Sequence, residues 1–363
     1  MKRLLCITAN MNAGGAETFL MKVYRVLDKT KYQMDFCVSS EKNDYTKEIN
    51  KMGGIIYVIP SKSENAYKSF NAIRKIVSEN RYEYVMRVNE HSLSVIDLIA
   101  AKFGGATKLI MRSSNSSSGG KVATLLHKTF KFLPISVPDI KLAPSLLAAE
   151  YTFGKKNVKT NKVTILRNGL DIDSFCFDMS KRNKIRKEFN LNNKFVVGHI
   201  GRFNKQKNHK LLLCIFCEIK TIKPNSMLLM VGVGNMMNEI KEEAIKLGIG
   251  DSCIFCGKRT DVDALLSAMD VFVFPSLYEG MPNTVIEAQV SGLPCLISDK
   301  ITKEANITGI VHFMSLDIAP KYWAEKAVNL DVYNREKYAN IVRESGYSIQ
   351  DVVKEFESLV FEK

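Results

Sequence analysis

Short apolar runs rich in β-branched residues alternate with longer amphipathic stretches along this chain of 363 residues. The short runs have the length of buried strands, and the stretches between them have the periodicity of helices. This alternation predicts parallel sheets that are covered by helices on both faces. We therefore expect an α/β fold of two doubly wound, Rossmann-like domains.

The expected elements fall into two groups. Strands of the first group are Arg3–Ala9, Gln33–Ser39, Ile55–Ile59, Tyr84–Val88, Lys108–Arg112, Ile140–Ala143 and Lys162–Leu166. Strands of the second group are Phe195–Ile200, Ser226–Val231, Cys253–Cys256, Val271–Phe274, Pro294–Ser298 and Val311–Met314. Helices are expected between them, and a last amphipathic helix is expected over Ile349–Phe361.

Length and turn signals predict two domains. A chain of this size exceeds what one hydrophobic core usually organises. The turn Arg167-Asn168-Gly169-Leu170 closes the first group of strands, and a polar stretch rich in Lys and Asn follows it. We expect a first domain over residues 1–170, a linker over 171–193 and a second domain over 194–344.

The excess positive charge lies in the first half of the chain. Residues 1–170 hold 27 Lys and Arg against 13 Asp and Glu, whereas the remainder holds 25 of each kind. Residues 102–162 alone carry 11 basic and 2 acidic side chains. Such a field predicts an anionic partner, namely nucleic acid, acidic lipid headgroups or a phosphorylated substrate. A merely soluble basic surface is the other interpretation.

Two Cys-x-x-Cys pairs raise the question of a metal site. Cys214 and Cys217 lie in an apolar helical run, and Cys253 and Cys256 lie in a strand-like run. Residues three apart in a strand point to opposite faces, so the second pair cannot hold one ion without a turn. We expect reduced thiols in a cytoplasmic protein and no metal.

Ligands of open parallel sheets bind beyond the carboxyl ends of the strands, so the turns from strand to helix are the candidate sites. After the first strand, Gly14 and Gly15 let backbone N–H groups approach an anion at a helix N-terminus. The full dinucleotide fingerprint is absent there, because the third glycine and the later acidic residue are missing.

The first strand of the second half is followed by a basic turn. Gly201 ends the strand, and Arg202 and Lys207 follow it, five residues apart. These two cations suit a diphosphate, because arginine can grip two oxygens and lysine adds a point charge. A solvated basic loop is the other interpretation.

The turn after the strand Val271–Phe274 carries the most specific motif of the chain. Its loop contains Glu279, and a helix is expected to begin near Asn283 or Thr284. The first N–H groups of that helix form an anion site. Glu287 lies one turn inside the helix, where a carboxylate can accept hydrogen bonds from a ribose diol. This spacing favours a binding site over two unrelated surface carboxylates, which is the other interpretation.

The segment FPSLYEGMPNTVIE resembles the E-x7-E motif of retaining glycosyltransferases with the two-domain GT-B fold, specifically family 4 of the carbohydrate-enzyme classification. The turns GGAE, RNGLDIDSF, GRFNKQKNH and VGVGN occur in the order of that family. The tail segments SDKITKEANIT and WAEKAV are similar to members that build bacterial capsular or exopolysaccharides. The resemblance covers nearly the whole chain.

The resemblance implies a sugar transferred from a nucleotide-diphosphate donor, first of all a UDP-sugar, without a metal or other cofactor. Arg202 and Lys207 would bind the diphosphate, Glu279 the sugar and Glu287 the ribose. It also implies that the last segment, about 345–363, crosses back to the first domain. The remaining donor-binding positions that it implies are Gly14, Gly15, Gly201, Lys258, Arg259, Gly280, Met281, Pro282, Asn283 and Thr284.

Departures from the family concern the first domain. His91 is the candidate counterpart of a histidine motif that contacts sugar or acceptor, and a surface or structural histidine is the other interpretation. Arg112, Ser113 and Asn115 lie at a strand end where they could approach the acceptor. The acceptor implied is a glycan or a lipid-diphosphate-linked sugar.

The basic first half of the chain would then contact an anionic membrane surface. Residues 120–134 combine Leu and Phe with Lys, as in helices that lie on anionic lipid. We expect a cytoplasmic protein with peripheral contact to the inner leaflet through residues 102–162; an amphipathic helix packed on its own sheet is the alternative. A nucleic-acid partner is not expected, because the sequence contains no recognisable reading element. A sugar-nucleotide epimerase and a non-catalytic nucleotide-sugar binder remain the alternative functions.

Overall fold

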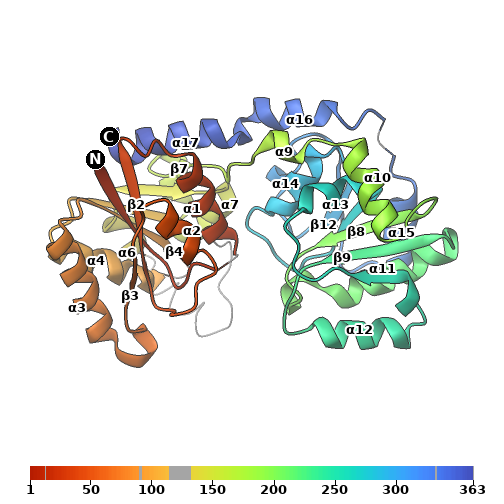
Figure 1. Ribbon diagram of the computed structural model, residues 1–363, viewed down its shortest axis with the longest axis horizontal. Coiled ribbons are helices and arrows are strands. Elements are labelled where there is room, and N and C mark those ends of the chain that lie inside the picture. The colour runs from red at the N-terminus through yellow and green to blue at the C-terminus, as the bar shows by residue number, and fades with distance from the viewer. Residues whose placement is uncertain (13, 90–91, 114–131, 332, 363) are drawn as a thin grey trace. The chain divides into compact units, whose positions relative to one another are not determined.

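The computed structural model describes residues 1–12, 14–89, 92–113, 132–331 and 333–362, and the chain divides into two compact units. Unit 1 comprises Met1–Leu170 and Ser348–Lys363, and unit 2 comprises Asp171–Tyr347 (Figure 1). Each unit contains one parallel sheet with helices packed on it, as the alternation of strands and helices predicted. Among the described helices, none is long and apolar enough to cross a bilayer.

Unit 1 is built on a seven-stranded sheet of order β3-β2-β1-β4-β5-β6-β7. All seven expected strands form, although the last is reduced to two residues. The elements of the unit are β1 Lys2–Ile7, α1 Gly15–Val26, β2 Tyr32–Val38, α2 Thr46–Lys51, β3 Ile56–Val58, α3 Lys62–Asn80, β4 Tyr84–Asn89, α4 Ile96–Phe103, β5 Lys108–Ser113, α6 Leu133–Ser136, β6 Ile140–Ala143, α7 Leu146–Phe153, α8 Lys155–Lys159, β7 Thr164–Ile165 and α17 Ile349–Glu357.

The helix α17 belongs to the core of unit 1, although it lies at the far end of the sequence (Figure 1). Its apolar face joins the cluster formed by α1 and β1, and Phe356 meets the ring of Phe19 edge-on with centroids 6.5 Å apart. Beyond α17, the ring of Phe361 stacks on Tyr32 at 4.3 Å. The amphipathic pattern of this segment therefore marks a helix that completes a core, as its apolar positions predicted.

Unit 2 is built on a six-stranded sheet of order β10-β9-β8-β11-β12-β13. All six expected strands form. The elements of the unit are α9 Ile172–Phe175, α10 Met179–Glu188, β8 Phe195–Ile200, the 3-10 turn η2 Lys205–Lys207, α11 His209–Ile222, β9 Ser226–Val231, α12 Met237–Lys246, β10 Cys253–Phe255, α13 Val262–Ala268, β11 Val271–Phe274, α14 Asn283–Val290, β12 Cys295–Ser298, β13 Val311–Met314, α15 Pro320–Val328 and α16 Lys337–Val342.

The strand β11 shows why a continuous apolar run forms a central strand. Phe272 and Phe274 enter the core on one face of the sheet, while Val271 and Val273 enter the core on the other face. Side chains alternate between faces in a strand, so a strand covered by helices on both sides is apolar at most of its positions. The chain order reverses between β8 and β11, which makes their carboxyl ends the switch point of this sheet.

The expected linker over residues 171–193 is wrong. This stretch forms α9 and α10 and belongs to unit 2, where α10 packs against α13. Its basic residues made it look like a solvated connection, but two of its arginines have fixed partners. Arg182 donates to Asp270 at 2.6 Å, and Arg186 donates to the other oxygen of the same carboxylate at 2.6 Å.

Three arginines close the C-terminal end of α13, and we call Arg182, Arg186 and Arg335 the arginine cap. Between them they donate hydrogen bonds to the carbonyl oxygens of residues 266–269. The last carbonyls of a helix have no partner within it and lie at its negative end, so cations are favoured there. Burial, together with the neighbouring Arg182, lowers the pKa of Arg335 to about 9.

Candidate active site

The turn after β8 is shaped by glycines that admit a second backbone. A Cβ atom on Gly232, whose φ is +138°, would lie 2.1 Å from the carbonyl oxygen of Gly201. A Cβ atom on Gly234 would lie 2.3 Å from the carbonyl oxygen of Phe203. The Gly-x-Gly after β9 therefore lets the β9 turn pack directly on the turn that carries the predicted diphosphate-binding cations.

Lys207 reaches the neighbouring turn from the end of η2. The side chain of Asn204 caps η2 and accepts a hydrogen bond from the backbone N–H of Lys207 at 3.2 Å. The ammonium Nζ then lies 2.6 Å from Oε1 of Glu279 and 4.5 Å from the centroid of the Phe274 ring. Two residues whose pairing the sequence did not predict thus form one ion pair, with side-chain exposures of only 16% and 10%.

Two further hydrogen bonds join the β8 and β11 turns. The backbone N–H of Leu277 donates to the carbonyl oxygen of Gln206 at 2.8 Å. The side-chain amide of Gln206 donates to the carbonyl oxygen of Tyr278 at 2.9 Å. Both bonds hold the residues just before Glu279, so the loop that carries Glu279 is tied to η2 and its position follows from the β8 turn.

The helix α14 begins at Asn283, where the sequence placed it. Pro282 occupies the N-cap position and supplies no side-chain cap. Glu287 lies half-buried one turn further along the helix. The start of α14 follows the same loop as Glu279, so a helix N-terminus, two carboxylates and a lysine are gathered after the central strands of unit 2.

A pair of buried histidines lies beside the basic turn and was not predicted as part of the site. His199, on β8, donates from Nδ1 to the carbonyl oxygen of Val273 at 2.9 Å, and its ring lies 4.7 Å from that of His209. The ring of His209 stacks on Phe203 at 4.2 Å. Burial, with a smaller contribution from the charge of Lys207, lowers the pKa of His209 to about 4. Both histidines are therefore neutral near pH 7, and they pack the base of the turn.

The other charged residues predicted for the site in unit 2 are not part of the Lys207–Glu279 ion pair. Arg202 is exposed at the end of β8, and Lys258 is exposed after β10. Arg259 donates to both oxygens of Asp261 and of Glu188, and these bonds raise its pKa. Its role as a donor-binding residue stays a prediction, but the structure already gives it a role in fixing its loop.

In unit 1 the predicted residues begin a helix. Gly14 is the N-cap of α1, and Gly15 is its first residue. A Cβ atom on Gly14 would lie 2.3 Å from Oε2 of Glu17, so the Glu17 carboxylate folds back over the end of the helix where an anion was expected. His91 lies outside the described residues. The predicted contacts of these residues with donor or acceptor stay predictions.

Arg112 and Ser113 are buried within unit 1. The guanidinium of Arg112 lies 3.6 Å from the ring centroid of Phe19 and donates to Asn168 Oδ1 at 2.5 Å. Burial lowers its pKa to about 9. Asn115 lies outside the described residues. Arg112 thus joins the end of β5 to the turn that closes the unit.

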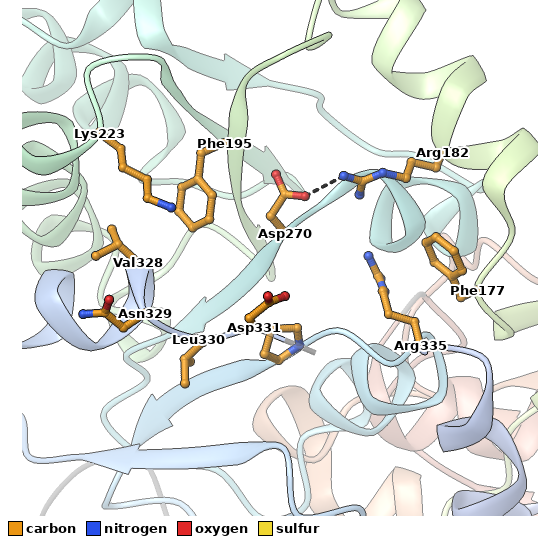
Figure 2. Close-up of a pocket in the computed structure, with 11 residues that line it drawn as sticks. Phe177, Arg182, Phe195, Lys223, Asp270, Val328, Asn329, Leu330, Asp331 and Arg335 are labelled. Atoms are coloured by element: carbon orange, nitrogen blue, oxygen red, sulfur yellow. Dashed lines mark hydrogen bonds and ion pairs between the residues drawn. The ribbon is translucent and has the colours of Figure 1, made fainter. Parts of the chain in front are cut away.

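A cavity of about 630 Å³ lies at the other end of the unit 2 strands from these turns, beside the amino ends of β8, β11 and β12. Figure 2 shows the Arg182–Asp270 ion pair at this cavity, with Phe195 and Phe177 on either side of it. Its other lining residues are Lys223, Pro294, Val328, Asn329, Leu330, Asp331 and Arg335. The strands separate this cavity from the turns that carry Lys207 and Glu279.

Known proteins are similar to this chain in sequence and in fold. The family described as glycosyl transferases group 1 matches residues 181–308. EpsF of Bacillus subtilis (strain 168), which is named as a glycosyltransferase, is 31% identical over 364 residues, spanning 97% of this chain and 94% of EpsF. The UDP-Gal:alpha-D-GlcNAc-diphosphoundecaprenol alpha-1,3-galactosyltransferase of Escherichia coli is 26% identical over 243 residues, spanning 64% of this chain and 62% of that protein.

The fold comparison agrees with the sequence comparison. The crystal structure of Anabaena Alr3699/HepE in complex with UDP and glucose superposes with a TM-score of 0.79 at 15% identity, and the match covers 99% of each chain. A structural match at 15% identity shows that the two proteins share a fold. The 31% identity to EpsF over nearly the whole chain shows the family. The protein is a glycosyltransferase with the GT-B fold, and it belongs to the group 1 glycosyl transferases.

Proposed function

We propose that this enzyme transfers a sugar from a UDP-sugar, with retention of anomeric configuration and without a metal, to a lipid-diphosphate-linked or glycan acceptor in surface polysaccharide synthesis. The Lys207–Glu279 ion pair carries this proposal. It brings a cation suited to the diphosphate next to a carboxylate suited to sugar hydroxyls, beside the start of α14.

The proposed roles divide the donor along its length. Lys207 and Arg202 hold the diphosphate and stabilise the negative charge that grows on it as the sugar departs. Backbone groups of residues 280–284 and the N-terminus of α14 add hydrogen bonds to the same anion. Glu279 accepts hydrogen bonds from the sugar, and Glu287 accepts them from the ribose.

The comparisons support the choice of UDP. HepE is described in complex with UDP and glucose, and the Escherichia coli relative carries UDP-Gal in its name. A panel of UDP-, GDP- and ADP-sugars tests the choice by thermal stabilisation and by hydrolysis in the absence of acceptor. We expect a UDP-sugar to raise the Tm and to be hydrolysed slowly. Stabilisation by GDP- or ADP-sugars alone would contradict the assignment.

The proposed acceptor places the enzyme at the inner face of the membrane. The name of the Escherichia coli relative includes a diphosphoundecaprenol-linked sugar, and here the basic charge lies in unit 1. Phe132 and Leu146 are exposed in this unit, and Lys155 and Lys156 are exposed on α8. Apolar and cationic side chains of this kind suit an anionic lipid surface. Residues 114–131, which contain most of the amphipathic stretch over residues 120–134, lie outside the described residues.

Sedimentation with anionic vesicles tests the membrane contact. We expect binding to phosphatidylglycerol vesicles at low salt and its loss at high salt, because exposed charges are screened. The double variant Lys155→Glu/Lys156→Glu should bind less. Its matched control is Lys241→Glu/Lys246→Glu, which reverses two exposed lysines on α12 of unit 2. Absence of binding by the unmodified protein at low salt would rule out the contact.

A further inference from the structure

Glu279 is paired with the Lys207 ammonium, the cation that the donor diphosphate is proposed to bind. The ammonium Nζ and the carboxylate Oε1 lie 2.6 Å apart, and both side chains are largely shielded from water. On the proposed function, on which this inference rests, the diphosphate binds the same ammonium. Its negative charge would then lie beside the Glu279 carboxylate, and like charges in a shielded place disfavour each other.

Both partners of the pair are held in place by other groups. The cap from Asn204 and the ring of Phe274 position Lys207, and the two hydrogen bonds of Gln206 fix the loop of Glu279. A contrasting pair in the same unit, Lys210–Glu239, has the same 2.6 Å separation but side-chain exposures of 58% and 49%. Water screens that pair more than it screens the Lys207–Glu279 pair, so a ligand that takes Lys207 from Glu279 breaks the less screened of the two pairs.

We propose that Glu279 makes the site prefer the intact sugar donor over released UDP. UDP must displace the carboxylate from Lys207 and offers it nothing in exchange. A UDP-sugar displaces the same carboxylate but presents sugar hydroxyls, which donate hydrogen bonds to it. After transfer the sugar is gone, and Glu279 returns to Lys207 as the nucleotide leaves. One ion pair therefore favours the donor over the released nucleotide and promotes product release.

Isothermal titration with UDP tests the competition. Glu279→Gln keeps the size and a hydrogen bond but removes the charge, and we expect it to bind UDP roughly tenfold more tightly or better. Lys207→Met should bind UDP at least about tenfold more weakly. In the double variant Lys207→Met/Glu279→Gln, the gain from the second substitution should be much smaller, because only the repulsion between Glu279 and the diphosphate is then removed. Glu239→Gln, the matched control, should leave the Kd unchanged.

The outcomes separate this proposal from the proposed function. If Glu279→Gln leaves the affinity for UDP unchanged or weakens it, while Lys207→Met weakens binding, the competition is overturned and the diphosphate role of Lys207 stands. An equal gain from Glu279→Gln with and without Lys207 indicates plain charge repulsion and also overturns it. If UDP does not bind the unmodified protein, or if Lys207→Met binds UDP as tightly as the unmodified protein does, the proposed function fails. Fluorescence of Trp323, which is buried in unit 2, confirms that each variant is folded.

Discussion

Arg202→Ala is expected to lower kcat/KM for the UDP-sugar by about 100- to 1000-fold, mainly through kcat. Its guanidinium is proposed to meet charge that develops on the diphosphate only as the sugar leaves, and loss of one such donor costs about this much. Glu287→Ala should act differently, because the ribose is bound equally in the ground state and the transition state. We expect a rise in KM of roughly 10- to 100-fold with little change in kcat.

Initial rates over a range of donor concentrations separate the two effects. Lys205→Ala provides the control, since Lys205 is an exposed cation on η2 that the proposal leaves without a role. Its rates should stay within about twofold of those of the unmodified enzyme. If Arg202→Ala and Glu287→Ala both retained full turnover, the assignment of the donor site to these turns would be wrong.

Asp270→Ala should lower the free energy of unfolding of unit 2 by about 3–5 kcal/mol. This carboxylate pairs with two members of the arginine cap at 2.6 Å each and also accepts the backbone N–H of Val196 at 2.8 Å. Removing one partner of a largely buried ion pair leaves the others charged and desolvated, which is the costly case. A polar group at the start of β8 loses its acceptor as well.

The chain contains one tryptophan, so urea unfolding followed by its fluorescence reports on unit 2. Trp323 is buried on α15 and donates from Nε1 to the carbonyl oxygen of Ser315 at 3.0 Å. The control is Asp263→Ala, which removes the more exposed Lys181–Asp263 pair from the same contact between α10 and α13. We expect a loss of at most about 1 kcal/mol from it. A similar loss in both variants would show that the cap contributes no special stability.

Local patterns were sufficient to predict the fold and the turns. Each of the thirteen expected strands forms in the described chain, because short, mostly apolar runs bounded by turn signals are typical of buried strands. The start of α14 at Asn283 followed from the loop signals before it. The helical pattern of Ile349–Phe361 was also correct, apart from a final π-helical turn over Ser358–Glu362.

Side-chain pairing over long distances in sequence could not be predicted in the same way. Lys207 and Glu279 are 72 residues apart, and Arg182 and Asp270 are 88 apart. A charged residue looks the same in the sequence whether it faces water or a distant carboxylate, so α10 was taken for a linker, and the bonds of Arg259 to Glu188 were not predicted. The buried histidines were missed for a related reason, since their neutrality follows from burial that only the packed turn creates.

The position of α17 also determines the order in which the units can be completed during synthesis. Unit 1 leaves the ribosome first, but the apolar surface around Phe19 and Tyr32 stays uncovered until Phe356 and Phe361 emerge. Unit 2 is continuous over Asp171–Tyr347 and has all of its core before that point. Domains tend to fold as units while the chain grows, so the half that begins first finishes last. During that interval unit 1 is the part of the nascent enzyme that depends on protection from aggregation.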